Sequence, residues 1–377
     1  MMSGTFKAPF LALALLLHLS AEAQIVPRTA IIENDALKRY LDNSDYNPHD
    51  YSYSSIGLFI PAQYARLDRP EPVVFNLPYA LRGKELVLEI LEDERDPVPV
   101  QTLAISPEST GCSVYNLAPG RLYCYRLKDP QSKRIVESGD FFVEGRRRMI
   151  RADNVRNIRD MGGLRTEDGA TLAYGRLFRG GAMDNARGAI RDTLFDKNGW
   201  TVLHDDLFIR ADIDLRSDRE LLLTDNNPYN DMSQSPLGAD VGHYHFPISD
   251  FGFITVGNMY GPVISCIVER LERGENVYFH CAQGADRTGV LAFLLGGMAG
   301  VCETDLARDY ELTCFALCRT NHTRCSVQPY NYGPSVQYIK NNFQGETLAR
   351  KIQDYLIKMH GVSPHEIESF RSIMVEE

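Results

Sequence analysis

The sequence has few of the features that mark nucleic-acid-binding proteins. Its 40 lysines and arginines are outnumbered by 50 aspartates and glutamates, which gives a formal net charge of −10. This acidic balance argues against nucleic-acid binding, because such proteins present basic surfaces to the phosphate backbone. The one short basic cluster, Arg146–Arg148, is expected to be part of a solvated linker.

Long apolar runs are also missing beyond the N-terminus. No such run reaches the ~18 residues of a membrane-spanning helix, so no membrane span is expected. The N-terminus has Lys7, then the apolar stretch Phe10–Leu17, then the small residues Ala21–Ala23. This order is typical of a secretory signal peptide over residues 1–23, with a short buried helix as the alternative. No cysteine stands at the cleavage site, which gives no indication of a lipid anchor. The protein is therefore expected to be periplasmic or secreted.

Eight cysteines are present, and three lie close together with a histidine. The segment Cys314–Cys325 contains Cys318 and His322, with spacings that a zinc site could use. In an exported chain, a local disulfide such as Cys318–Cys325, or simple thiols, is favoured over zinc. The sequence does not fix the connectivity.

Tryptophan is nearly absent, with Trp200 the single one in the chain. Residues 24–50 form an N-terminal segment with one short helix at 32–42. Seven β-type runs then occupy residues 51–145 and predict a β-sandwich domain. The runs are 55–60, 72–77, 85–91, 98–105, 111–117, 122–127 and 135–144. The spacing Leu117–Tyr123 resembles the tyrosine corner of fibronectin type III domains, but their strand tryptophan is missing, so immunoglobulin-like is the broader label. This domain could bind a partner.

Residues 146–153 are expected to be a linker to a second domain, 154–377. There strand-like and helix-like segments alternate, which predicts an α/β domain with a mostly parallel sheet flanked by helices. The last helix has a predicted N-cap at Ser363, with Pro364 and Glu366 following it.

The most informative stretch is Val277–Leu295, which reads as strand, tight loop and helix. The glycines Gly284 and Gly289 suggest a nucleotide-binding loop, but Val290 stands where that motif needs lysine. The loop instead offers the Cys281 thiol, backbone N–H groups and the Arg287 guanidinium. Backbone N–H groups at a helix N-terminus bind anions, and an arginine fork binds two phosphate oxygens. The same positive field lowers the pKa of a thiol.

The segment "HCAQGADRTG" resembles the His-Cys-x5-Arg-Ser/Thr signature of the cysteine-dependent protein tyrosine phosphatases. Asn157–Gly181 and Ala211–Glu220 are similar to other segments of the bacterial tyrosine- and lipid-phosphatase branch of that family. The resemblance covers roughly residues 154–377 and implies a central parallel sheet flanked by helices. It also implies a reaction that needs no metal and no other cofactor.

The resemblance assigns a role to each residue of the loop. Cys281 is the nucleophile that forms a phosphocysteine, and Arg287 with the loop amides holds the phosphate oxygens. The substrate-binding loop residues are Ala282, Gln283, Gly284, Ala285, Asp286 and Arg287. Thr288 is expected to hydrogen-bond the thiolate, and His280 to orient the loop. Asp160 either lines the substrate pocket or pairs with Arg159. Arg216 is expected to form a scaffold ion pair.

Two aspartates compete for the role of general acid, which must protonate the leaving oxygen. Asp250 follows a predicted strand and resembles the mobile acid loop of dual-specificity phosphatases. Asp286 lies inside the loop, where the bacterial branch has its proposed acid. Both stay open, with a slight preference for Asp286.

Ala285 stands where the lipid-phosphatase branch often has a lysine. This favours a phosphorylated protein or a small phosphotyrosine-like monoester as the substrate. An inositol phosphate or phosphoinositide is the alternative, and a binding module without turnover is a third.

Overall fold

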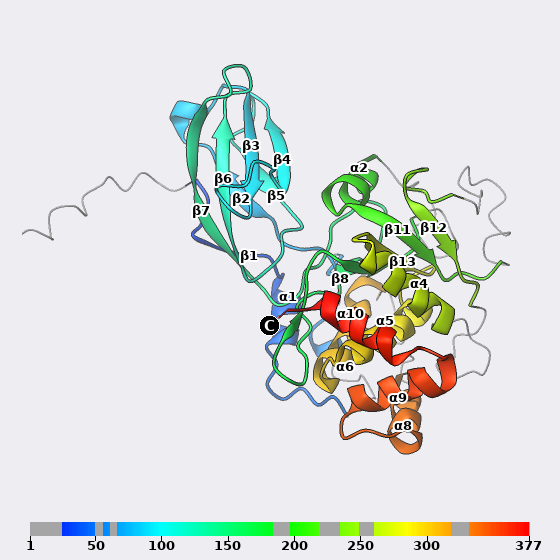
Figure 1. Ribbon diagram of the computed structural model, residues 1–377. Coiled ribbons are helices and arrows are strands. Elements are labelled where there is room, and N and C mark those ends of the chain that lie inside the picture. Colours follow the sequence, from blue (N-terminus) through cyan, green and yellow to red (C-terminus); the bar gives the residue numbers. More distant parts are fainter. Residues whose placement is uncertain are drawn as a thin grey trace, which may run out of the picture. The chain divides into compact units, whose positions relative to one another are not determined.

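The chain folds into two units whose segments interleave along the sequence (Figure 1). The computed structural model describes residues 25–49, 56–60, 66–183, 197–218, 234–248, 260–317 and 332–376. The smaller unit holds Val74–Ser113 and Tyr123–Phe141, together with the described residues before Ile31. The larger unit holds Ile31–Val73, Val114–Leu122 and the chain from Phe142 onwards.

Strands with alternating buried and exposed residues make up the smaller unit, although some of their terminal residues belong to the larger unit. One sheet has the order β1–β7–β6–β3–β4, and β2 pairs with β5 in a second sheet. The strands are β1 (Thr29–Ile31), β2 (Val73–Asn76), β3 (Leu86–Leu91), β4 (Gln101–Ile105), β5 (Gly111–Val114), β6 (Arg121–Lys128) and β7 (Ile135–Glu144). In β2, Val73 and Phe75 are buried while the residues between and after them are exposed. A period of two puts the buried residues on one face of the sheet.

Aromatic rings connect the two sheets of the smaller unit. Phe75 of β2 packs edge-on against Tyr125 and Phe141, with ring centroids 5.3 and 5.5 Å apart. Tyr123 stacks on Phe141 at 5.8 Å and is buried. Each sheet thus turns an apolar face to the other. The tyrosine-corner hydrogen bond of Tyr123 stays a prediction.

The first of the seven predicted β runs is wrong. Within residues 55–60, Ile56–Leu58 form a short 3-10 helix, η1. Ile56 and Ile60 are both buried in the core of the larger unit. In a strand, Leu58 would lie on the same face as Ile56 and Ile60, yet it is 79% exposed, so the burial lacks the period of a strand. The other six runs correspond to β2–β7.

The predicted N-terminal segment 24–50 is not separate from the domain that follows later in the chain. Helix α1 (Asp35–Leu41) forms where a helix was predicted, and Asn34 Oδ1 accepts a hydrogen bond from the backbone N–H of Leu37 at 3.0 Å. The buried side chains of Leu37 and Tyr40 belong to the main hydrophobic core of the larger unit. Burial of this apolar helix face is the physical reason why the boundary differs.

The predicted linker 146–153 is wrong as well, because part of it lies in the interior of the larger unit. Arg147, Met149 and Ile150 are each at most 4% exposed. Met149 forms a β-bridge with Arg159, and Arg147 donates a hydrogen bond to Asp309 at 2.9 Å. A buried arginine needs such a carboxylate partner.

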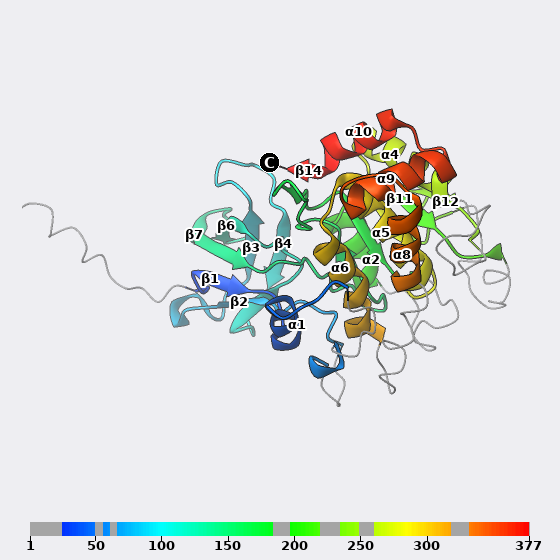
Figure 2. The ribbon, with the colours of Figure 1, turned by 90° about the horizontal axis from the view of Figure 1, so that it is seen from below.

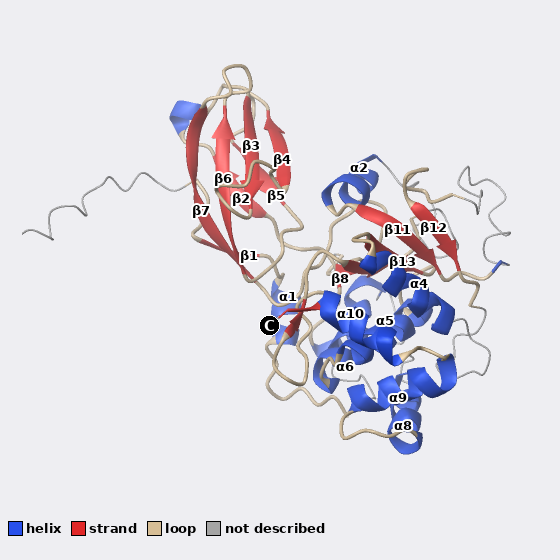
Figure 3. Ribbon diagram, viewed as in Figure 1, coloured by secondary structure: helices blue, strands red, loops and turns tan. Residues whose placement is uncertain are grey.

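A five-stranded, mostly parallel sheet is the centre of the larger unit (Figure 3). Its order is β12–β11–β13–β10–β8, with β8 antiparallel to β10 at one edge. The strands are β8 (Arg159–Asp160), β10 (Leu177–Gly180), β11 (Ile209–Asp214), β12 (Gly242–His245) and β13 (Asn276–His280). The last four were predicted from the sequence. Two further short strands, β9 (Thr171–Leu172) and β14 (Val375–Glu376), pair with each other.

Helices cover both faces of this sheet. One face carries α4 (Tyr260–Glu272), α5 (Asp286–Ala299), α6 (Glu303–Leu317), α8 (Tyr332–Asn342), α9 (Leu348–His360) and α10 (Pro364–Met374). The other carries α2 (Lys197–Thr201) and the π-helical turn η3 (Val202–Asp206). Neighbouring residues of β10 separate accordingly: Leu177 joins the first core and Phe178 the second.

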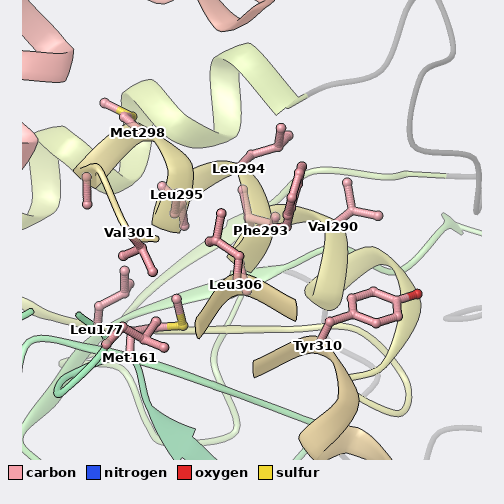
Figure 4. Close-up of a cluster of buried hydrophobic side chains, with 14 of the residues drawn as sticks. Met161, Leu177, Val290, Phe293, Leu294, Leu295, Met298, Val301, Leu306 and Tyr310 are labelled. Atoms are coloured by element: carbon pink, nitrogen blue, oxygen red, sulfur yellow. The ribbon is translucent and has the colours of Figure 1, made fainter. Parts of the chain in front are cut away.

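The helix that follows the predicted phosphate loop, α5, is buried on nearly all sides. It packs against α6, α9 and α10, and Figure 2 shows it among these helices. Figure 4 shows side chains of α5, such as Phe293 and Leu295, close to Leu306 of α6. The helix α10 starts with the predicted capping box, in which Ser363 and Glu366 bond reciprocally. This packing fixes the direction of α5 and therefore of its N-terminus.

Candidate active site

The segment from Cys281 to Arg287, called the phosphate loop below, lies at the carboxyl edge of the parallel strands. Gly180 of β10 and Asp214 of β11 are both paired in register with His280, the last residue of β13. Ligands of open α/β sheets bind outside this edge. The loop ends in α5, whose N-cap Ala285 makes no side-chain capping bond. The first N–H groups of the helix are thus not capped by its own N-cap side chain.

Glycines let the phosphate loop pack directly against the end of β10. Gly284 has a φ of 65°, in the left-handed region that favours glycine. A Cβ atom on Gly284 would overlap the backbone of Gly180 and lie 2.7 Å from the nitrogen of Gly181. The Ala182 N–H also donates to the carbonyl oxygen of Ala282 at 3.3 Å. The shape of the loop is therefore set by backbone packing.

Cys281 is buried, with 3% of its surface exposed. Burial on its own raises the pKa of a thiol, yet the pKa of Cys281 lies below that of an ordinary cysteine. The charge of Arg287, the hydroxyl of Thr288 and the backbone N–H groups of Thr288 and Gln283 outweigh the burial. These groups stabilise the thiolate, which is the nucleophilic form.

Arg287 is held by two carbonyl oxygens at the ends of neighbouring strands. Its Nη1 donates to Leu215, just after β11, and to Ile248, after β12, at 3.2 Å in both cases. The side chain is 2% exposed. These bonds fix the guanidinium beside the loop, where it acts on the thiolate.

His280 lies directly before Cys281 and between two carboxylates. Its Nε2 is 3.0 Å from Asp212 Oδ1 and its Nδ1 is 4.0 Å from Asp214 Oδ1. The shorter contact is an ion pair, although its angles do not meet hydrogen-bond geometry. Burial lowers the pKa of His280, but Asp214 and Asp212 raise it to about 9. The imidazolium form is therefore favoured at neutral pH.

Asn157 clamps the phosphate loop from behind, a role that the sequence did not reveal. Its Nδ2 donates to the carbonyl oxygens of Gly284 at 2.8 Å and Gln283 at 3.3 Å. Its own backbone has a φ of 58°, and its N–H donates to Asp68 Oδ2 at 2.9 Å. Arg159 Nη1 donates to Asn157 Oδ1 at 2.7 Å. The side-chain amide is thus locked in one orientation.

Asp309 of α6 connects three buried arginines beneath the loop. Its Oδ1 accepts from Arg147 and Arg159, both at 2.9 Å, and its Oδ2 accepts from Arg179 at 2.6 Å. Burial opposes ionisation, but these cations hold the pKa of Asp309 well below its usual range. Arg179 Nη2 also donates to the Gly284 carbonyl oxygen at 3.0 Å. The arginines outnumber the carboxylate, which adds positive potential under the loop.

Asp160 and Arg216 each form a buried ion pair with a neighbouring residue. Asp160 binds Arg148 Nη1 at 3.1 Å and the N–H groups of Gly162 and Gly175 at 2.8 Å. These contacts favour the structural alternative for Asp160, although its partner is Arg148. Arg216 forms the expected ion pair, with Asp214 at 2.6 Å.

Of the two predicted acids, Asp286 lies in the described residues and Asp250 outside them. Asp286 is half-buried at the first position of α5. Burial and the charge of Asp286 raise the pKa of Tyr310, so the two side chains are close. Ile248, which binds Arg287, is the last residue described before Asp250.

A buried tyrosine whose pKa responds to the charge of Cys281 was also missed by sequence reasoning. Tyr260 opens α4, and its hydroxyl has no hydrogen-bond partner within the described part of the chain. Burial and the charge of Cys281 raise its pKa, which places it within electrostatic reach of the thiolate. Its sequence position, far from any recognisable motif, gave no signal.

The structure describes only some of the residues of the predicted cysteine–histidine cluster. Six cysteines in the described residues are free thiols, whereas Cys318, His322 and Cys325 lie outside that part of the chain. Among the described residues, no group of three or more His, Cys, Asp or Glu side chains could hold a metal ion. In the same residues, no helix has both the length and the apolar character needed to cross a bilayer.

Several solved structures resemble this chain weakly. The core catalytic domain of the PP-IP phosphatase SIW14 from S. cerevisiae is 13% identical; the match spans 45% of this chain and 92% of that one, with a TM-score of 0.26. TpbA of P. aeruginosa is 13% identical over 54% of this chain and 88% of that one, with a TM-score of 0.23. The tyrosine phosphatase OH1 of Orf virus is 14% identical over 50% and 87%, with a TM-score of 0.20. Scores this low establish no shared fold.

No curated protein matched the chain. The model of the tyrosine phosphatase family matches residues 150–376, which is more than half of the 377 residues. This match includes the phosphate loop and every strand of the sheet that carries it. The chain therefore belongs to the tyrosine phosphatase family and is a hydrolase of phosphoric monoesters.

Proposed function

We propose that the protein hydrolyses phosphotyrosine-type monoesters through a phosphocysteine intermediate. The observation that carries this proposal is the stabilised thiolate of Cys281, set among Arg287, Thr288 and the N–H groups of the loop. In the first step the thiolate sulfur attacks phosphorus, an S–P bond forms, and the bond to the leaving oxygen breaks. In the second step water attacks phosphorus, the S–P bond breaks, and inorganic phosphate leaves.

The loop provides charge stabilisation for both steps. Arg287 and the backbone N–H groups hold the non-bridging oxygens of the phosphoryl group. Asn157 and Arg179 bind the loop carbonyl oxygens, which turns the loop N–H groups away from them and toward the substrate. The Thr288 hydroxyl contributes to the lowered pKa of Cys281, and in this proposal it stabilises the sulfur when it departs as a thiolate in the second step.

The leaving oxygen needs a proton, because a phenolate or alkoxide is a poor leaving group. The position of Asp286 at the start of α5 supports it as the general acid. Asp250 is supported as the alternative acid because it lies two positions after Ile248, whose carbonyl oxygen binds Arg287. One of the two gives its proton in the first step and takes one from water in the second.

The phosphate loop favours a substrate with a single phosphate group. Ala285 is 1% exposed, and its side chain carries no charge. A lysine at this position, as in the lipid-phosphatase branch, would provide a cation for an additional phosphate. An inositol phosphate is therefore the second candidate rather than the first.

Activity should first be measured on para-nitrophenyl phosphate in a buffer with EDTA, which removes metal ions. Cys281→Ser should abolish turnover, since a serine hydroxyl is far less ionised than a thiolate near neutral pH. Arg287→Lys should fail as well, because an ammonium cannot make a two-pronged contact. The phosphocysteine should be trapped by acid quenching and found by mass spectrometry on the peptide of Cys281. Turnover by the serine variant at the wild-type rate would refute the mechanism.

A substrate panel then separates the two candidate functions. Phosphotyrosyl peptides should give a higher kcat/KM than inositol phosphates of any phosphorylation state. The opposite order would replace the first candidate by the second. If the protein binds phosphate but turns over no substrate, it is a binding module and not an active phosphatase.

The proposal includes export and a role for the smaller unit. Cleavage after Ala23 would give a mature chain that starts near Gln24, and mass spectrometry of protein from its native cells tests this. An intact Met1 would contradict export. The smaller unit is proposed to be an immunoglobulin-like sandwich that can bind a partner, supported by the facing rings of Phe75, Tyr125 and Phe141.

A further inference from the structure

Arg179 of β10 lies beneath the phosphate loop and is completely buried. Its Nη1 donates to Asp309 Oδ2 at 2.6 Å, and its Nη2 donates to the carbonyl oxygen of Gly284 at 3.0 Å. Its Nε atom is also buried and has no hydrogen-bond partner within the described residues. The guanidinium is thus enclosed between α6 and the loop, away from water.

A glycine of α5 makes room for this guanidinium. A Cβ atom on Gly289 would lie 3.6 Å from Arg179 Nη2 and 2.9 Å from the ring of Tyr310. Gly289 is the fourth residue of α5, so Arg179 lies against the N-terminal end of that helix. The helix dipole places a partial positive charge at this end, which disfavours a nearby cation. The position of Arg179 is therefore costly unless an anion offsets it.

Carboxylates are too few to neutralise the buried arginines in this region. Arg147, Arg159 and Arg179 are each at most 4% exposed. In the described part of the chain, Asp309 is the only carboxylate within ion-pair distance of their guanidinium groups. Three arginines against one carboxylate leave a surplus of positive charge, and buried charge without a partner is unfavourable.

The other titratable side chains around Arg179 and Cys281 do not remove this surplus. They are Tyr260 of α4, Tyr278 and His280 of β13, Asp286 and Arg287 of α5, and Tyr310 of α6. Burial raises the pKa of all three tyrosines, which are therefore neutral near pH 7. His280 has its own carboxylates in Asp212 and Asp214. The charge of Asp286 is balanced in number by that of Arg287.

The thiolate of Cys281 is an anion within electrostatic reach of this surplus. Burial and the neighbouring Arg159 lower the pKa of Arg179 to about 9, whereas Asp309 and the charge of Cys281 act in the opposite direction. The attraction between two charges is mutual, so Arg179 also favours the ionised form of Cys281. The cation that is costly beside the helix terminus is thus useful to the thiolate.

We infer that Arg179 is a positioning residue of the active site that supports the nucleophile in two ways. Its hydrogen bond holds the Gly284 carbonyl oxygen, and its charge stabilises the Cys281 thiolate in addition to the charge of Arg287. This inference deepens the proposed function and rests on it, because there the thiolate attacks phosphorus. The ionisation of the thiol can nevertheless be measured without any turnover.

The first experiment follows alkylation of Cys281 by iodoacetamide against pH in the full mature chain, with the Cys281 peptide identified by mass spectrometry. Arg179→Gln removes the charge but keeps an N–H donor, so the pH midpoint should rise by about half a pH unit or more. Arg179→Lys keeps the charge, so its midpoint should stay within about 0.2 pH units of wild type.

Asp309→Asn distinguishes an electrostatic role from structural support. It removes the negative charge beside Arg179, so the positive potential at the thiolate increases and the midpoint should fall. Loss of structural support would instead raise the midpoint in both Asp309→Asn and Arg179→Gln. Asp309→Asn also tests the charge if the Arg179 variants fail to fold. The matched control is Arg95→Gln, since Arg95 is an exposed arginine paired with Asp93, and it should leave the midpoint unchanged.

Three results of this experiment would each overturn the inference. They are a wild-type midpoint in Arg179→Gln, an equal rise in Arg179→Lys and Arg179→Gln, and a raised midpoint in Asp309→Asn. None of them depends on the identity of the substrate.

The second experiment measures the hold on Gly284 through hydrolysis of para-nitrophenyl phosphate. An ammonium cannot reproduce the fork that reaches both Asp309 and Gly284, so Arg179→Lys should lower kcat/KM about tenfold although its thiol stays as ionised as that of the wild type. An unchanged kcat/KM would contradict this hold. A wild type without turnover refutes the proposed function and leaves the alkylation result standing. Turnover by a wild type whose alkylation midpoint is independent of Arg179 refutes the present inference alone.

Discussion

Asn157 Nδ2 donates a hydrogen bond to the carbonyl oxygen of Gly284 at 2.8 Å, from a position 127 residues earlier in the chain. The same nitrogen contacts the Gln283 carbonyl oxygen and Thr313 of α6. An amide that is fully buried and bonded on both ends is a rigid support for the loop.

Asn157→Asp should lower kcat/KM about 10–100-fold, because buried hydrogen bonds to the loop are worth ~1–3 kcal/mol when broken. The aspartate side chain has the same shape as asparagine, but it presents an oxygen instead of an N–H donor to the two loop carbonyl oxygens. The matched control is Asn116→Asp, since Asn116 also has a positive φ and bonds to the backbone of Arg151. The control should lower the melting temperature and leave kcat/KM of the folded protein unchanged. Equal rates for Asn157→Asp and the wild type would show that the clamp does not matter to catalysis.

The thiolate of Cys281 should persist at lower pH than an ordinary thiolate. Its pKa is lowered, so the rate of alkylation by iodoacetamide should fall only as the pH drops through a midpoint below ~8.5. Thr288→Val removes the hydroxyl donor and should move this midpoint up. Burial raises the pKa of Cys302, which serves as an internal control and should react more slowly at pH 7. Peptide mass spectrometry distinguishes the two cysteines, and a midpoint for Cys281 at or above that of Cys302 would contradict the geometry.

The general acid can be identified from two aryl phosphates with leaving groups of different pKa. Loss of the acid should slow the ester with the poor leaving group ~10²–10⁴-fold and the other one much less. Asp286→Asn and Asp250→Asn are compared on both esters, with Asp93→Asn, an exposed aspartate of the smaller unit, as the control. If both variants slow the two esters equally, neither aspartate is the acid.

The ion pair of His280 should make stability depend on pH in the alkaline range. The pKa of His280 in the folded protein is raised to about 9, above the ordinary value of 6.5. Its contribution is therefore complete below pH 6.5 and is lost as the pH rises through 9. Asp212→Asn removes one carboxylate, so its melting temperature should fall furthest below wild type near pH 6. The difference should shrink by pH 10, and a difference that is constant with pH would rule out the charged pair.

Local patterns in the sequence were sufficient to predict the strands and the helix that carry the candidate site. The strands β10–β13 are short apolar runs. In the phosphate loop, the spacing of Cys281 and Arg287 predicts that one positive field both binds phosphate and stabilises the thiolate. The capping box of α10 depends on residues three positions apart and was predicted correctly. Each of these features is decided by neighbours in the chain.

The supports of the loop could not be predicted, because their partners are distant in sequence. Asp309 lies on a helix with several other charged residues, and only the fold brings Arg147 and Arg179 to it. Arg147 looked like part of a solvated basic cluster for the same reason. The error at Ile56–Leu58 arose because a short apolar run fits a strand or a helical turn equally well.

The backbone contact between Gly284 and Gly180 has a consequence for attempts to change the substrate. The loop is confined by main-chain atoms on the side of β10, and Ala285 is buried on another side. Larger side chains at positions 284 and 285 would mainly yield misfolded variants, because these two positions have no room for additional volume. Directed evolution of this enzyme should therefore leave positions 284–285 fixed and diversify other residues, such as the half-buried Ala282 and Gln283.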